Sequence, residues 1–95
     1  MQLIVGLLTV DIFIPAASSL KEKRAIVKSV KDKIGNKFNI SIAEIDYQDK
    51  WQRARFGIAQ VGNNYKFVES SLMTIFNIID SYGTFQIIDH NFEFI

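Results

Sequence analysis

The chain has 95 residues, of which 48% are hydrophobic and 22% are charged, so it can form one small core and is too apolar to be disordered. Its net charge is only +1, so the overall charge gives no reason to expect nucleic-acid binding. It has no cysteine, so it can form neither disulfides nor thiolate metal sites. We therefore expect a single domain over residues 1–95, suited to the cytoplasm.

Residues 2–14 are rich in β-branched and large apolar side chains and predict a long first strand. Its apolar part, Leu3–Val10, has about half the length that spans a bilayer, and no basic residue precedes it as in an export signal. We therefore expect no membrane segment. The first half of the strand is apolar on both faces, which indicates either a central strand or a surface that awaits a partner.

A helix is predicted from Ser19 to about Ile34. Ser19 and Glu22 have the spacing of a capping box, and Gly35 with Asn36 would end the helix. The helical period predicts a buried stripe of five apolar side chains: Leu20, Ile26, Val27, Val30 and Ile34.

Basic side chains at spacings of three, four and three residues follow one flank of this predicted helix. They are Lys21, Arg24, Lys28 and Lys31, and we call them the basic flank. Most charged helix faces are simply solvated, and that alternative stays open. However, like charges at this spacing repel one another, and a bound phosphate backbone would convert the repulsion into attraction.

Two more strands, a second helix and a fourth strand complete the predicted chain. The strands cover residues 38–45, 54–61 and 84–95, and the helix covers residues 65–81. The break in alternation at residues 43–45 predicts either a β-bulge or the end of the strand. The resulting order, βαββαβ, favours a ferredoxin-like α+β sandwich, in which two helices cover one face of a four-stranded antiparallel sheet. The second helix would bury Val68, Leu72, Ile75, Phe76 and Ile79.

Residues 43–55 join the second and third strands and contain three acids, three bases, two glutamines and the only tryptophan. A plain hairpin needs only a short polar turn, often with Gly or Asn, and this connection has neither. We therefore predict that residues 46–53 form part of a functional surface. Its candidate residues are Gln48, Trp51, Gln52 and Arg53. An alternative for Trp51 is a structural plug at the edge of the core.

No pattern in the sequence indicates catalysis or a cofactor. Glu44, Asp46 and Asp49 could hold a hard cation, but their spacing matches no calcium loop and the adjacent bases favour ion pairing. His90, the only histidine, has no nearby serine or cysteine in sequence. The chain also lacks a phosphate-binding glycine loop and a nucleophile elbow. We therefore expect a non-enzymatic protein without a metal or cofactor.

Several short motifs carry a family resemblance. They are Ser19–Arg24, Phe38–Glu44, Gln48-Asp49, Trp51–Ala54 and Gly57. Together they resemble the YlxP-like family, domain of unknown function 503, over nearly the whole chain, although the likeness weakens after Asn64. The resemblance implies a ferredoxin-like fold. In many bacteria the family's genes lie beside those for translation initiation and ribosome-binding factor A, which implies a role in ribosome maturation or translation. The family has no established catalytic residues.

We therefore expect an accessory module that binds RNA or a ribosomal particle. The basic flank would contact phosphates, and the candidates in residues 46–53 would add contacts to bases or to RNA shape. The alternative is a protein–protein interaction module that acts as a homodimer through apolar surface on the open sheet face or the fourth strand. A metal- or carboxylate-dependent enzyme is a third, more distant possibility.

Overall fold

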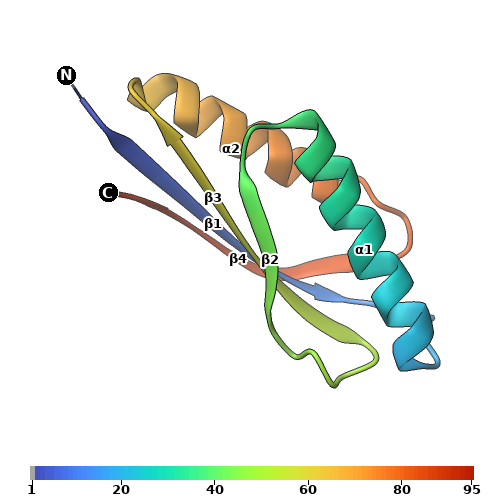
Figure 1. The fold of residues 1–95 in the computed structure, drawn as a ribbon. Coiled ribbons are helices and arrows are strands. Elements are labelled where there is room, and N and C mark those ends of the chain that lie inside the picture. The colour runs from blue at the N-terminus through green and yellow to red at the C-terminus, as the bar shows by residue number, and fades with distance from the viewer. Residues whose placement is uncertain (1) are drawn as a thin grey trace.

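The computed structural model describes residues 2–95 as six elements in the order βαββαβ. They are β1 (Ile4–Phe13), α1 (Leu20–Lys37), β2 (Ser41–Asp46), β3 (Arg53–Gly62), α2 (Tyr65–Asp80) and β4 (Gln86–Phe94). The strands form one antiparallel sheet in the order β2-β3-β1-β4. Both helices cover the same face and leave the other face open (Figure 1). This arrangement confirms the predicted ferredoxin-like sandwich.

The two central strands define what each face of the sheet carries. β1 pairs with β3 along its full length, from Ile4 opposite Gly62 to Phe13 opposite Arg53, and it pairs with β4 on its other side. Even-numbered residues of β1 point toward the helices, whereas odd-numbered residues lie on the open face. β2 pairs with β3 through the predicted hairpin, and its register shifts between Glu44 and Asp46, which confirms the predicted bulge.

The core lies between the sheet and the helices. Its fully buried members from the strands are Leu8, Val10, Ile12, Phe56 and Ile58, and those from the helices are Val27, Val30, Ile34, Val68, Leu72, Ile75 and Ile79. The predicted stripes are therefore largely confirmed. Leu20, Ile26 and Phe76 are only half-buried, and the α1 stripe contains a charged residue that the prediction omitted, Lys23.

The first strand and the second helix approach each other closely at Gly6. A Cβ atom at this position would lie 2.6 Å from Cγ1 of Val68 and 2.7 Å from Cδ1 of Leu72. Both neighbours are completely buried, so neither side chain can move away easily. Because Gly6 has no side chain, α2 can pack closely on β1.

Two details of α1 differ from the prediction. The helix continues to Lys37 through Gly35 and Asn36, and it ends where Phe38 turns to extended backbone while its N–H donates to the Ile34 carbonyl at 3.0 Å. The backbone hydrogen bonds of the extra turn outweigh the helix penalty of glycine, which is about 1 kcal/mol. β2 accordingly begins at Ser41, later than the predicted start at residue 38.

The hydrogen bonds at the start of α1 also differ from those of the predicted capping box. Ser19 accepts from the Glu22 N–H at 3.1 Å, as predicted. The Glu22 carboxylate instead accepts from the hydroxyl and the N–H of Ser18, at 2.7 and 3.2 Å. These hydrogen bonds from Ser18 lower the pKa of Glu22.

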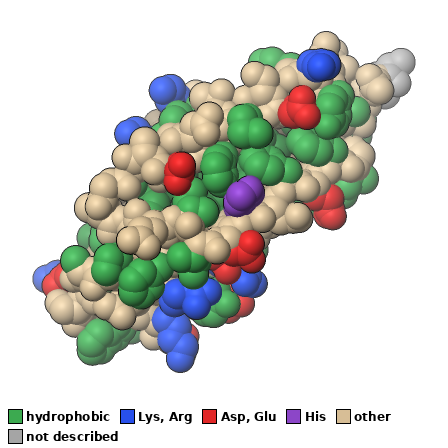
Figure 2. Space-filling model, turned by 180° about the vertical axis from the view of Figure 1, so that it is seen from behind, with side chains coloured by type: hydrophobic (Ala, Val, Ile, Leu, Met, Phe, Trp, Pro, Cys, Tyr) green, Lys and Arg blue, Asp and Glu red, His purple; other side chains and the backbone are tan. Residues whose placement is uncertain are grey.

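The side of the molecule seen from behind is mainly apolar at its centre. Figure 2 shows hydrophobic side chains around the histidine, with few lysines or arginines nearby. The ring centroids of His90 and Phe76 lie 4.6 Å apart. No helix within residues 2–95 is long and apolar enough to cross a membrane.

Candidate nucleic-acid interface

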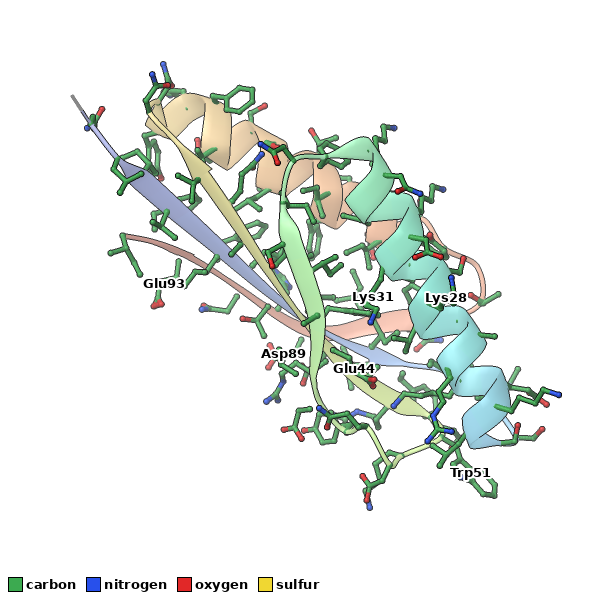
Figure 3. The ribbon with its side chains drawn as sticks, viewed as in Figure 1. Lys28, Lys31, Glu44, Trp51, Asp89 and Glu93 are labelled. Atoms are coloured by element: carbon green, nitrogen blue, oxygen red, sulfur yellow. The ribbon has the colours of Figure 1, made fainter. Side chains whose placement is uncertain are left out.

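The basic flank lies along α1 on the side that faces the β2 edge of the sheet. Three of its members, Arg24, Lys28 and Lys31, border a groove of about 450 Å³ between this helix and β2. Glu44 reaches the groove from the strand (Figure 3). Lys21 lies nearer the helix start and is exposed to solvent, but it does not line the groove.

Most of the positive charge on this flank has no internal partner. Lys28 pairs with Asp32 one turn further along the helix, with 2.6 Å between Nζ and Oδ2, and both side chains are exposed. Within residues 2–95, Lys21, Arg24 and Lys31 form no ion pair. An exposed pair such as Lys28–Asp32 is weak, so its lysine is also available to an anion from outside.

The connection between β2 and β3 is a compact turn that is tied to other parts of the chain. The Lys50 N–H donates to the Tyr47 carbonyl at 3.0 Å and closes the turn. At its far end, the Gln52 side chain donates to the Pro15 carbonyl at 2.9 Å, and the Ile14 N–H donates to the Gln52 carbonyl at 2.9 Å. The connection is therefore anchored to the segment that leads from β1 into α1.

Trp51 follows the turn of this connection and lies beside the start of α1 (Figure 3). Trp51 is 52% exposed, so the alternative in which its side chain plugs the edge of the core is wrong. It borders a hollow of about 640 Å³ together with Ala17, Ser18 and Lys50, among others. An indole that is half in solvent, between two neighbours whose backbone is hydrogen-bonded, offers a face on which a flat group can stack.

The other candidates from this connection have structural contacts of their own. The Gln48 side chain donates to the Glu44 carbonyl at 3.4 Å, and that of Gln52 is held by Pro15. The Arg53 guanidinium lies 4.4 Å from the centre of the Tyr47 ring. The structure thus places the predicted residues on one connection, but it leaves Trp51 as the member whose side chain is most available.

A buried carboxylate on the open face organises the arginines of β3. Asp11 is only 5% exposed, and Arg55, its direct cross-strand partner, donates from Nε to Oδ1 at 2.5 Å and from Nη2 to Oδ2 at 3.0 Å. Arg53 adds a contact of 3.6 Å, and Asp46 lies 3.4 Å from Arg55. The hydrogen bonds to Asp11 raise the pKa of Arg55, whose guanidinium is charged in any case. The prediction missed this cluster, although an acid within an apolar strand was a signal for it.

A second buried charge lies on the helix face of the sheet. The Lys23 side chain is completely buried, and its Nζ atom lies 2.5 Å from Oε2 of Glu44 and 2.7 Å from the Tyr47 carbonyl oxygen. Because Glu44 faces the helices while Asp46 faces the arginines of the open face, the acids of this region separate into two ion-paired groups. Within residues 2–95, no three His, Cys, Asp or Glu side chains converge as metal ligands.

The fold and these side chains define a small ferredoxin-like α+β protein with a basic helix flank next to an exposed tryptophan. Residues 5–92 match the family described as "Protein of unknown function (DUF503)", and the chain belongs to this family. It is 45% identical over 78 residues to "Uncharacterized protein YlxP" of Bacillus subtilis (strain 168). That alignment covers 82% of this chain and 85% of the relative. A shared fold and family do not specify an activity, so function has to be argued from the surface itself.

Proposed function

We propose that this protein is a non-enzymatic module that binds RNA, free or within a ribosomal particle, through the basic flank and Trp51. One observation carries the proposal. Lys21, Arg24 and Lys31 have no internal ion pair, and they lie on the helix whose start adjoins an exposed, anchored tryptophan.

The length of the basic flank suits a run of phosphates. From Lys21 to Lys31 the helix rises about 15 Å, which accommodates roughly four phosphates at a rise of about 3.4 Å per nucleotide of a stacked strand. The groove beside Arg24, Lys28 and Lys31 gives such a strand a path between α1 and β2. Glu44 borders this groove, but Lys23 already neutralises its charge.

Trp51 supplies a contact of a different chemical kind. An aromatic ring stacks on an unpaired base of any identity, with a contribution of about 1–3 kcal/mol per base. Lys50 lies beside it in the same hollow and can approach the adjoining phosphate. The combination of phosphate contacts with a stacking platform favours single-stranded RNA over a uniform duplex.

Charge reversal on the basic flank tests the proposal. Lys28→Glu with Lys31→Glu should leave the thermal midpoint nearly unchanged, because one side chain is exposed and the other half-buried. It should weaken co-sedimentation with ribosomal subunits, and binding to ribosomal RNA, at least about tenfold at low salt.

The same helix offers a matched control. Lys33→Glu with Lys37→Glu makes an equal charge change on the opposite flank of α1, where both side chains are exposed. This variant should bind much as the parent does. If both double variants lose the same affinity, or if the parent binds neither subunits nor RNA at low salt, the proposal is wrong.

A second proposal, a homodimer through the open sheet face, is favoured by the apolar surface there. Ile45 and Val61 are 50% and 62% exposed, and a hollow of about 280 Å³ lies over Gly57 and Ala59. The strands have ten (β1), six (β2), ten (β3) and nine (β4) residues, and at about 3.3 Å per residue along a strand and about 4.8 Å between strands the face measures roughly 550 Å². That approaches the roughly 800 Å² per partner of a stable interface.

Sedimentation equilibrium decides the second proposal. It should give twice the 10.9 kDa chain mass at micromolar concentration. A value of 10.9 kDa that persists at high protein concentration would exclude the dimer.

A further inference from the structure

Lys23 is a charged side chain in a place where an apolar one would be expected. It lies on the stripe of α1 that packs on the sheet, together with Val27, Val30 and Ile34, and none of its side chain is exposed. Burying an ammonium group is unfavourable, and a well-packed apolar side chain of similar volume often serves stability as well or better. The contacts of its Nζ atom indicate what the charge is used for.

One of these contacts is made to the connection that carries Trp51. In addition to its ion pair with the Glu44 carboxylate, Nζ donates a hydrogen bond to the Tyr47 carbonyl oxygen at 2.7 Å. Tyr47 is the one non-glycine residue within 2–95 with a positive φ, 65°, a conformation that a bulky side chain adopts only when its surroundings enforce it. The same carbonyl accepts the Lys50 N–H at 3.0 Å, so Lys23 holds the oxygen that closes the turn before Trp51.

The Tyr47 side chain is held from the opposite face of the sheet. Its ring centre lies 4.4 Å from the Arg53 guanidinium and 5.2 Å from that of Arg55, and Asp11 fixes both arginines. The arginines thus restrain the ring, whereas Lys23 restrains the backbone. Of these groups, Lys23 is the one that belongs to the helix of the basic flank, where it stands between Lys21 and Arg24 in sequence.

We propose that Lys23 is a positioning residue that fixes the turn at Tyr47 and thereby presents Trp51 in register with the basic flank. This inference rests on the proposed RNA-binding function, because it assigns Lys23 a role toward that same surface. A turn fixed before binding leaves less motion to be lost when the ligand binds. The Lys23 ammonium touches no ligand itself.

The test removes the bond to Tyr47 without leaving a buried charge. Lys23→Met with Glu44→Met keeps the net charge and approximately the volume, and replacing both members of a buried ion pair is usually tolerated. The comparison variant is Glu44→Gln, which breaks the same ion pair and so lowers stability, but keeps Lys23 and its hydrogen bond to Tyr47; it separates loss of that bond from a general loss of stability.

Two measurements on the free protein report on the turn. In Lys23→Met/Glu44→Met, the Lys50 amide should exchange with solvent about three- to tenfold faster than in the parent, as expected for the loss of one supporting hydrogen bond. Trp51, the only tryptophan, should be more accessible to acrylamide quenching. Affinity for a single-stranded ribosomal RNA fragment should fall about three- to tenfold. Glu44→Gln should be less stable than the parent, because it leaves the Lys23 ammonium without a charged partner, but it should keep the parent's Trp51 quenching and RNA affinity under conditions where it is folded.

The outcomes separate this inference from the proposed function. If Lys50 amide exchange and Trp51 quenching are unchanged in the double methionine variant, the positioning role is wrong, whether or not its RNA affinity changes. A loosened turn with unchanged RNA affinity would overturn it too. If the parent binds no RNA, the proposed function fails, while exchange and quenching still show whether Lys23 fixes the turn. If the double variant does not fold, exchange in the parent decides: a Lys50 amide that exchanges at the rate of an unstructured chain overturns the inference.

Discussion

The basic side chains of this protein fall into two groups that the sequence does not distinguish. Lys23, Arg53 and Arg55 each lie against a carboxylate that is buried or nearly so, Glu44 or Asp11. Lys21, Arg24 and Lys31 form no ion pair within the described residues 2–95. The first group fixes the shape of the β2–β3 connection, and the second group leaves its charge available to a partner.

This difference explains why a net charge of only +1 is compatible with a basic surface. Asp11 and Glu44 are both used inside the first group, where they hold the connection in place. The outer face of α1 is consequently more positive than the composition suggests, with Asp32 as its acidic neighbour beside Lys28. Repulsion among these exposed charges is relieved when an anion binds.

The largest expected effect is a loss of stability when one member of the buried Lys23–Glu44 pair is replaced. Lys23→Met alone leaves Glu44 buried without its partner, and removing one member of a buried pair costs about 3–5 kcal/mol of unfolding free energy. Lys23→Met with Glu44→Met should recover most of this loss. Urea unfolding of the two variants measures the difference, and equal stability of single and double variants would show that the pair is not coupled.

The next largest effect is a loss of RNA affinity when Trp51, the exposed side chain on the β2–β3 connection, is replaced. Trp51→Ala should leave unfolding free energy nearly unchanged, because half of the residue surface is already in solvent. It should weaken binding of single-stranded RNA by about 1–3 kcal/mol, the contribution of one stacked base. Fluorescence anisotropy with a labelled RNA measures the binding. A large loss of stability would instead identify Trp51 as a structural residue.

A smaller effect should strengthen binding. Asp32→Asn removes the carboxylate that pairs with Lys28 on the surface of α1. An exposed pair contributes about 0.2–1 kcal/mol, so freeing this lysine should tighten RNA binding by about two- to fivefold with little change in thermal midpoint. The same titration reveals the effect, and weaker binding in this variant would argue against contact between Lys28 and phosphate.

The smallest effect concerns an exposed acid that belongs to neither group. Hydrogen bonds from Ser18 lower the pKa of Glu22 below its ordinary 4.5. A carboxyl whose folded-state pKa is lowered contributes stability above its unfolded pKa and loses that contribution as the pH falls through the folded value. Ser18→Ala should therefore lower the thermal midpoint slightly at neutral pH and not in strong acid. A midpoint difference that is the same at both pH values would contradict this origin.

Local patterns were sufficient to predict the fold. Alternation placed β1 and β3, and the period of three to four residues identified most of the buried stripes of both helices. The predicted helix end at Gly35 was wrong because a weak local preference yielded to one more turn of backbone hydrogen bonds before Phe38.

The site was less predictable because it depends on which face each charge occupies. The bulge between Glu44 and Asp46 sends one carboxylate to Lys23 and the other to Arg55, and sequence spacing alone cannot assign those partners. A pairing of Asp11 with Arg55 could have been read from the antiparallel register, but only once that register was known. The residue next to Trp51, Gln52, is in turn held by Pro15, a contact 37 residues apart in sequence that spacing alone cannot predict.

The salt dependence of RNA binding tests the central distinction between the two groups most directly. The slope of log affinity against log salt counts the phosphates that a protein neutralises, at about 0.7 per phosphate of a single strand. Lys28→Gln with Lys31→Gln should reduce the steepness of this slope by about 1.4, because two such contacts are removed. Lys33→Gln with Lys37→Gln, on the opposite flank of α1, should leave it unchanged. If the parent and both variants share one slope, the basic flank contacts no phosphate and is an ordinary solvated helix face.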